Sequence, residues 1–233
     1  SFFYLSIIKK DMQDFKGALE AINRELDINE DARGYLTRAT IQRSLGNQEE
    51  ALKDADLALT FNENDESDWL YYIRSEIKLD MGNIKGALED IDKALTNERD
   101  LQLKSDRTLY YFLRSKIKYV SNDNKQALDD INKAFESLKL SRQEKEDKDL
   151  NQEHIINLYK LRGEIRYKLN DKSGAIEDIS EALNLLQQFF SKNKQFSNLT
   201  NDIKDLYQIR SQIKQELGDK DAAIEDMKMA EKY

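Results

Sequence analysis

Arginine recurs at five places inside otherwise apolar segments of this sequence, and an aspartate follows each of them after 16 residues. The arginines are Arg38, Arg74, Arg114, Arg162 and Arg210, and the aspartates are Asp54, Asp90, Asp130, Asp178 and Asp226. A guanidinium and a carboxylate withdrawn from water compensate each other, whereas either one alone is costly to bury. We therefore predict five structural ion pairs. The alternative is a row of arginines that binds an anionic ligand.

The side chains that most enzymes use for catalysis are scarce in this chain. It has one histidine and no cysteine, which excludes thiolate zinc sites and cysteine nucleophiles and leaves little basis for serine–histidine chemistry. The sequence contains no glycine-rich phosphate loop, no paired histidines on a helix and no dinucleotide fingerprint. We expect no catalytic residue, no metal site and no cofactor, and hence a protein that is not an enzyme.

The composition also restricts the class of protein. Of the 233 residues, 39% are hydrophobic and 35% are charged, the net charge is −8 and the mean hydropathy is −0.80. So polar a chain is unsuited to one large compact core. The negative charge disfavours binding to nucleic acid, which needs basic surface. No apolar run approaches the roughly 20 residues of a membrane span, so we expect a soluble protein, with the cytoplasm as the default compartment.

One short pattern recurs six times along the chain. An alanine followed by leucine or isoleucine is found at Ala18, Ala51, Ala87, Ala127, Ala175 and Ala223. With that alanine numbered as position 20 of each repeat, position 10 is always isoleucine, position 4 is always aromatic, position 8 is always small, and position 27 is alanine in five of the six repeats. Such a period predicts an array of structural repeats.

Each repeat has the pattern of two antiparallel helices. Apolar residues follow one helical stripe on either side of a turn at positions 15 and 16. Position 15 is glycine or asparagine in five repeats and position 16 is always Asp or Asn, which are residues that end one helix and cap the next. Positions 7 and 23 then lie opposite each other, which places the predicted ion pairs inside a hairpin or between adjacent hairpins. The first repeat has Leu5 and Ala21 there, so both charges are missing together.

These positions resemble the tetratricopeptide repeat (TPR) family over nearly the whole chain. The resemblance implies an all-α fold, an α-solenoid of about six antiparallel helix-turn-helix repeats in a single domain over residues 1–233. We place the repeats at about 1–29, 30–65, 66–102, 103–147, 148–196 and 197–233. The family's proline near position 32 is missing, and the later repeats exceed the usual length of about 34 residues. Long helices or inserted loops are therefore expected around Lys139–Asn151 and Lys192–Thr200.

The resemblance also implies that the first helix of each repeat lines a concave binding face, mainly through positions 2, 5, 9 and 12. In the middle of the array these positions are aromatic and apolar: Trp69, Tyr72, Leu79, Leu109, Phe112 and Tyr119. Exposed clusters of this kind mark interaction sites for proteins, here an apolar or aromatic peptide or helix. In the alternative, the longer fifth and sixth repeats bury these residues internally.

The function that fits these observations is a protein-interaction scaffold, an accessory subunit or assembly factor of a larger complex. A regulatory or substrate-positioning repeat domain of a larger enzyme is the alternative, and an RNA-binding helical repeat fits less well because the proposed face has no regular basic column. The apolar first segment, residues 1–5, is expected to be a cut edge or to dock on another chain or on upstream repeats. The charged last residues are expected to form a natural end.

Overall fold

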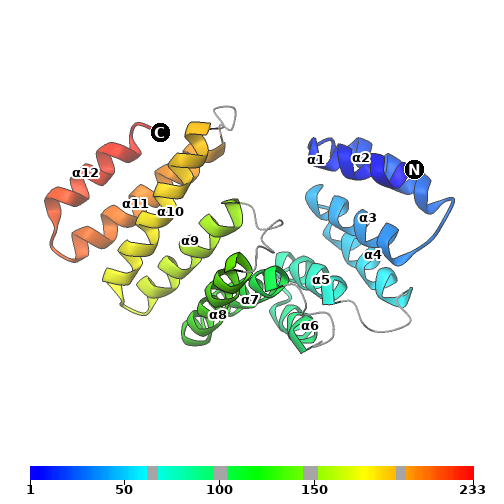
Figure 1. Cartoon of the computed structure of the whole chain (residues 1–233), viewed down its shortest axis with the longest axis horizontal. Helices are drawn as coiled ribbons and strands as arrows, with labels where there is room; N and C mark the ends of the chain where they lie inside the picture. The colour runs from blue at the N-terminus through cyan, green and yellow to red at the C-terminus, as the bar shows by residue number, and fades with distance from the viewer. Residues whose placement is uncertain (62–67, 97–103, 144–151, 193–197) are drawn as a thin grey trace. The chain divides into compact units, whose positions relative to one another are not determined.

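The computed structural model describes residues 1–61, 68–96, 104–143, 152–192 and 198–233. In these residues it contains twelve α-helices and no strand (Figure 1). The helices are α1 (Phe2–Asp11), α2 (Phe15–Leu26), α3 (Ala32–Ser44), α4 (Gln48–Thr60), α5 (Asp68–Asp80), α6 (Ile84–Thr96), α7 (Lys104–Val120), α8 (Asn124–Gln143), α9 (Gln152–Lys168), α10 (Lys172–Lys192), α11 (Asn198–Glu216) and α12 (Lys220–Ala230). Odd-numbered helices are the first helices of the predicted repeats, so the all-α repeat prediction is confirmed.

Consecutive helices form six tight hairpins, α1 with α2 through α11 with α12. Position 15 of every turn lies in the left-handed region, with φ between 61° and 86°. Glycine or asparagine occupies it in five hairpins, whereas the first hairpin has Gln13 (φ 61°). The next residue stands at the N-cap of the second helix. In the first hairpin, for example, the side chain of Asp14 accepts a hydrogen bond from the Gly17 amide at 3.0 Å. The turn signals of the sequence therefore fix the hairpins locally.

Replacing Gly82 by alanine is expected to cost about 1 kcal/mol of the free energy of unfolding, because alanine is strained at φ 75°. A Cβ at Gly82 would meet no atom within 4 Å, so the loss comes from the backbone alone. Urea titration followed by the fluorescence of Trp69, the single tryptophan, measures it. Gln13→Gly is the matched opposite change and should raise the free energy of unfolding by a similar amount. Effects of the same sign from the two substitutions would contradict this account of the turns.

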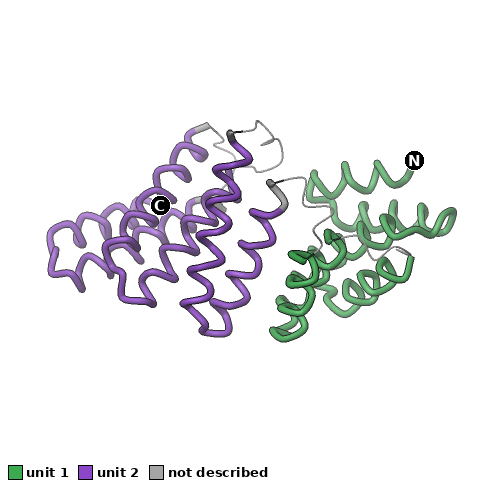
Figure 2. The backbone as a smooth tube through the Cα atoms, turned by 60° about the horizontal axis from the view of Figure 1, so that its bottom comes forward, with its two compact units in different colours: residues 1–102 green, residues 103–233 purple. Residues whose placement is uncertain are grey.

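Contacts within the chain define two compact units, residues 1–102 and residues 103–233 (Figure 2). Unit 1 holds α1–α6 and unit 2 holds α7–α12. Inside each unit, the second helix of one hairpin packs against the first helix of the next: α2 on α3, α4 on α5, α8 on α9 and α10 on α11. Each unit is thus a stack of three hairpins whose core lies between layers.

The small and isoleucine columns of the sequence form this core. The position-10 isoleucines Ile41, Ile77, Ile117, Ile165 and Ile213 are fully buried, as are five of the six alanines at position 20. At position 8, Ser75 donates a hydrogen bond from its Oγ to the carbonyl oxygen of Ala87 at 2.8 Å, which holds the two helices of a hairpin close together. Ile8 is the exception in its column, since 56% of it is exposed.

The later repeats are longer because their helices are longer. α8 has 20 residues and α10 has 21, against 12 in α2 and 13 in α4. Residues 139–143, which the sequence left open as helix or loop, are the end of α8. Of the two expected insertions, residues 144–151 and 193–197 lie outside the described residues, and residues 198–200 begin α11. No helix in the described ranges has the length and apolarity to cross a bilayer.

Candidate functional site

Each of the five arginines binds the aspartate 16 residues later with a pair of parallel hydrogen bonds. The guanidinium Nε donates to Oδ2 at 2.8–2.9 Å, and Nη2 donates to Oδ1 at 2.6–2.7 Å. All five aspartates are buried, with at most 4% of the residue exposed. The arginines also lie against the position-4 tyrosines, with distances of 5.3–5.7 Å from Cζ to the ring centroid. A row whose guanidinium edges already face the protein's own carboxylates is poorly placed to bind an anionic ligand.

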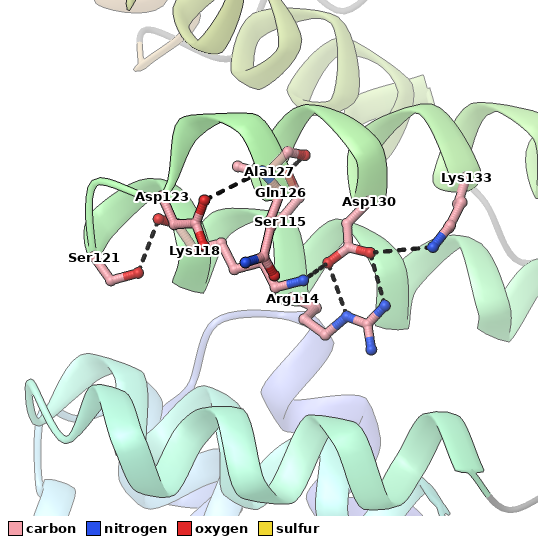
Figure 3. A network of polar contacts seen from close by, with 9 residues as sticks. All are labelled: Arg114, Ser115, Lys118, Ser121, Asp123, Gln126, Ala127, Asp130 and Lys133. Atoms are coloured by element: carbon pink, nitrogen blue, oxygen red, sulfur yellow. Dashed lines mark hydrogen bonds and ion pairs between the residues drawn. The ribbon is translucent and has the colours of Figure 1, made fainter.

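A second cation, which the sequence reasoning missed, completes four of the five pairs. It stands at position 11, one turn after the arginine, and its nitrogen lies 2.7–2.9 Å from Oδ2 of the same aspartate. The residues are Lys78, Lys118, Arg166 and Lys214. Figure 3 shows the arrangement around Asp130, where Arg114, Lys118 and the more distant Lys133 converge on one carboxylate. The sequence carried a signal for this second cation, because position 11 is Lys or Arg in each of the last four repeats.

Three of the arginines also connect neighbouring hairpins. The third donor, Nη1, reaches position 25 of the preceding hairpin: Asn23 from Arg38 at 3.1 Å, Asp56 from Arg74 at 2.7 Å, and Ser180 from Arg210 at 2.9 Å. The ion pairs therefore lie inside the hairpins, and a further hydrogen bond joins adjacent ones. Of the two arrangements considered from the sequence, the ion pair within the hairpin is the one present, and the bond to position 25 is an additional contact.

The charge state of the buried aspartates follows from these contacts. Burial alone would raise the pKa of Asp130, but the hydrogen bonds from Arg114 and Lys118 outweigh it and hold the pKa below its ordinary value. The same balance lowers the pKa of Asp90 and Asp226. These carboxylates remain ionised at neutral pH and act as structural anions.

Polar contacts also join the first helices of successive hairpins, on the face that the resemblance assigns to a partner. Arg43 of α3 lies 2.9 Å from Glu76 of α5. Tyr167 of α9 donates a hydrogen bond to Glu216 of α11 at 2.6 Å. These contacts fall at positions 9, 12 and 13, and they occupy part of that face with internal bonds.

Glu164 of α9 belongs to this set, because it shares a hydrogen bond with Tyr119 of α7. Burial raises the pKa of Glu164, so ionisation is less favourable in the folded chain than in the unfolded chain. The stabilisation that the folded state gains from this group is therefore present below its ordinary pKa of 4.5 and is lost as the pH rises through the raised value.

We expect Glu164→Gln to raise the free energy of unfolding at pH 7 by about 0.5 kcal/mol or more, and to have little effect at pH 4. Glutamine keeps an acceptor for Tyr119 and carries no charge. Thermal unfolding at the two pH values measures the difference. Glu177→Gln removes the same charge from an exposed place on α10 and is the control. A gain at pH 7 in both variants would assign the effect to net charge and not to the burial of Glu164.

In unit 1 the structure brings together two of the predicted partner-binding residues. Trp69 and Tyr72 of α5 stack with ring centroids 4.9 Å apart and an interplanar angle of 21°. Tyr72 is buried, whereas 41% of Trp69 is exposed. Leu79, two turns further along α5, is half-buried. Only Trp69 of these three presents a large apolar surface to solvent.

In unit 2 the predicted residues lie mostly inside the stack. Leu109, Phe112 and Tyr119 are partly buried and pack against a core cluster that includes Leu161 and Ile165 of α9. The internal alternative therefore accounts for much of their apolar surface. Within the described residues, no group of three or more His, Cys, Asp or Glu side chains is arranged to hold a metal ion.

Comparison with known proteins identifies the architecture. No protein-family model and no curated protein matches the sequence. Among solved structures, the Cut9–Hcn1 hetero-tetramer of APC/C superposes with a TM-score of 0.70 and 13% identity, over 98% of this chain and 42% of that chain. A tetratricopeptide repeat protein from Parabacteroides merdae superposes with a TM-score of 0.63 and 20% identity, over 99% of this chain and 77% of that chain. A thermophilic TPR protein of Thermus thermophilus superposes with a TM-score of 0.64 and 13% identity, over 88% of this chain and 96% of that chain.

The chain therefore has the fold of tetratricopeptide repeat proteins, as the resemblance in its sequence predicted. It spans less than half the length of the Cut9–Hcn1 chain that it matches. At these identities the likeness establishes the helical repeat architecture. What the chain binds has to be argued from its own surface.

Proposed function

We propose that this chain is a non-catalytic interaction scaffold, an accessory subunit of a larger complex, and that it binds a partner protein through the first-helix face of unit 1 with Trp69 as the anchor. The observation that carries the proposal is the exposure of Trp69 on a rigid support. Tryptophan is among the residues that contribute most to binding energy at interfaces.

The support of Trp69 is built from contacts of α5 and α3. The indole stacks on Tyr72, whose phenol bonds to Glu76, and Glu76 is in turn paired with Arg43. Each member of this series is held by the next, so the indole has little rotational freedom to lose on binding. An anchor that is already ordered in the free protein binds with a smaller entropic cost than a mobile one.

The surroundings of Trp69 define the kind of partner. The charged groups of this face lie further along α5, where Arg43 bonds Glu76 and Asp80, about two and three turns after Trp69. A peptide or helix with an apolar or aromatic side chain for the indole and polar residues about two turns further along matches this arrangement. The Cut9–Hcn1 neighbour is itself a hetero-tetramer, which supports an assembly role for this architecture.

The test is co-purification of partner proteins with the intact chain and with Trp69→Ala. We expect the alanine variant to lose most of the recovered partner, since truncation of such an anchor costs about 2 kcal/mol or more of binding free energy. Leu57→Ala is the matched control, because 40% of Leu57 is exposed on α4, a second helix of the same unit. Far-UV circular dichroism shows that both variants fold. Equal recovery with Trp69→Ala would move the partner site to another surface.

A further inference from the structure

The first helix of the chain, α1, exposes an apolar face whose equivalent is buried in α3 and α5. Tyr4, Leu5, Ile8 and Met12 of α1 are 41–75% exposed. Ile8 stands at position 10 of its repeat, and the equivalent residues of α3 and α5, Ile41 and Ile77, are fully buried. In those helices the second helix of the preceding hairpin packs on the same side. The outer side of α1 is therefore a surface of the kind that, in the other hairpins of a unit, packs on the second helix of the preceding hairpin.

The last helix exposes the other half. Met227 of α12 stands at position 24 and is 44% exposed, and its neighbour Ile224 is 53% exposed. At position 24 of α2, α4, α8 and α10 the equivalent residues are at most 1% exposed: Ile22, Ala55, Ile131 and Ile179. A groove of about 470 Å³ runs along this side of α12, between Gln215 of α11 and Glu231, with Met227 and Lys228 in its wall. α12 lies at the outer edge of unit 2 (Figure 1).

The charges at the two faces select which first helix fits on α12. At three of the four places where hairpins stack inside a unit, the arginine at position 7 bonds position 25 of the preceding hairpin, as Arg74 bonds Asp56. At position 25 of α12 the residue is Lys228, which is exposed. An arginine stacked there would meet a cation. α1 is the only first helix of this sequence with an uncharged residue at position 7, and that residue is Leu5.

We propose that a second copy of this chain places the outer face of its α1 on the exposed side of α12, so that copies associate head to tail through the same contact that stacks hairpins within a unit. Leu5 replaces the usual arginine at position 7, and Lys228 replaces the neutral or acidic residue at position 25. The two fit together, because a leucine over Lys228 leaves the lysine amino group free to reach solvent. The two faces differ, so the contact is heterologous and leaves one free face at each end of a dimer. One hairpin-sized interface is small, and association is weak.

The first experiment is sedimentation velocity of the chain over a concentration series, with Ile8→Glu and Met227→Glu. We expect the mass of the wild type to rise with concentration, and each variant alone to remain a single chain because every copy has lost one face. A mixture of the two variants keeps one intact face of each kind and should form a dimer that grows no further. Ile28→Glu, at an isoleucine that is 74% exposed beyond the end of α2, is the matched control and should associate like the wild type.

The second experiment tests the charge argument. Leu5→Arg should weaken association at least about tenfold, because it sets an arginine against Lys228. Adding Lys228→Asp to Leu5→Arg should restore association, since aspartate is the partner that Asp56 provides inside unit 1. Circular dichroism shows that each variant is folded.

Three results would overturn the proposal. The first is a wild-type chain that stays monomeric up to about 1 mM, a concentration at which an interface with a dissociation constant of about 1 mM would already form dimers. In that case the face on α1 belongs to another occupant, such as an upstream hairpin. The second is normal self-association of Met227→Glu, which would mean that two α1 faces pair with each other. The third is a double variant that associates no better than Leu5→Arg alone.

Discussion

Replacing Asp130 by alanine is expected to lower the free energy of unfolding by about 3 to 5 kcal/mol, the usual cost of leaving buried charge without its partner. Asp130 is 1% exposed and accepts hydrogen bonds from Arg114 and Lys118. The substitution leaves both cations beside a small apolar cavity between α7 and α8. Urea unfolding followed by circular dichroism, and amide hydrogen exchange of the peptides from α7 and α8, measure the loss.

The comparison that identifies the cause removes the cations as well. Arg114→Leu and Lys118→Met combined with Asp130→Ala should be less destabilising than Asp130→Ala alone, because no charge is then left without a partner. Asp54→Ala is a second control: Asp54 has the bidentate arginine, Arg38, but position 11 of its repeat is Gln42, so fewer charges lose their partner. Equal losses in the single and the triple variant would show that the carboxylate contributes by packing and not by its charge.

The pH dependence of this contribution has a definite sign. The pKa of Asp130 is lowered in the folded chain because the hydrogen bonds from Arg114 and Lys118 outweigh the effect of burial. A lowered pKa means that the stabilisation is present above the ordinary value of 3.8 and is lost as the pH falls through the folded value. The difference in stability between the wild type and Asp130→Asn should therefore shrink as the pH falls below about 4.

The hairpins and the ion pairs could be predicted because their signals are local or compensating. Gly46, Gly82 and Gly218 stand where the turn needs a left-handed residue, and each of the six turns is followed by an Asp or Asn that starts the next helix. The joint absence of charge at Leu5 and Ala21 linked two columns that lie far apart in the sequence. A pair of charges that is lost together in one repeat indicates contact in the others.

The additional partners were harder to see for physical reasons. Lysine is common on helix surfaces, so the cations at position 11 read as solvated until the geometry shows that Lys118 lies 2.7 Å from Asp130. Position 25 is harder still, since Asn23, Asp56 and Ser180 accept the same hydrogen bond with different chemistry. A column that varies in residue type gives no visible pattern even when its role is constant.

The binding face could be predicted only in part. Trp69 and Tyr72 lie one turn apart on one helical stripe, and nothing in the sequence indicates that the first is exposed and the second buried. That outcome depends on what the neighbouring hairpin places over each ring. The same reasoning explains Ile8, which shares its residue type and position with the core isoleucines and differs only in having no hairpin packed on its outer side.

This contrast gives the second large prediction. Ile165→Ala should lower the free energy of unfolding by about 2 to 5 kcal/mol, because Ile165 is fully buried in the core cluster of unit 2 and its truncation opens a cavity. Amide hydrogen exchange of the peptides from α9 and α10 reports the loss where it occurs. Small protection changes there, of less than about tenfold, would mean that neighbouring side chains such as Leu161 close the space.

Ile8→Ala is the matched control, since it makes the same chemical change at the same repeat position of α1. More than half of Ile8 is exposed, so the substitution removes little buried surface and should cost less than about 1 kcal/mol. Urea unfolding followed by circular dichroism measures this cost, at a dilution at which copies of the chain do not associate. If both isoleucines cost the same, repeat position alone would set the energetics. A large difference shows that stability comes from the hairpin stacked on each isoleucine, which is how an array held together by its neighbours differs from a globule with one core.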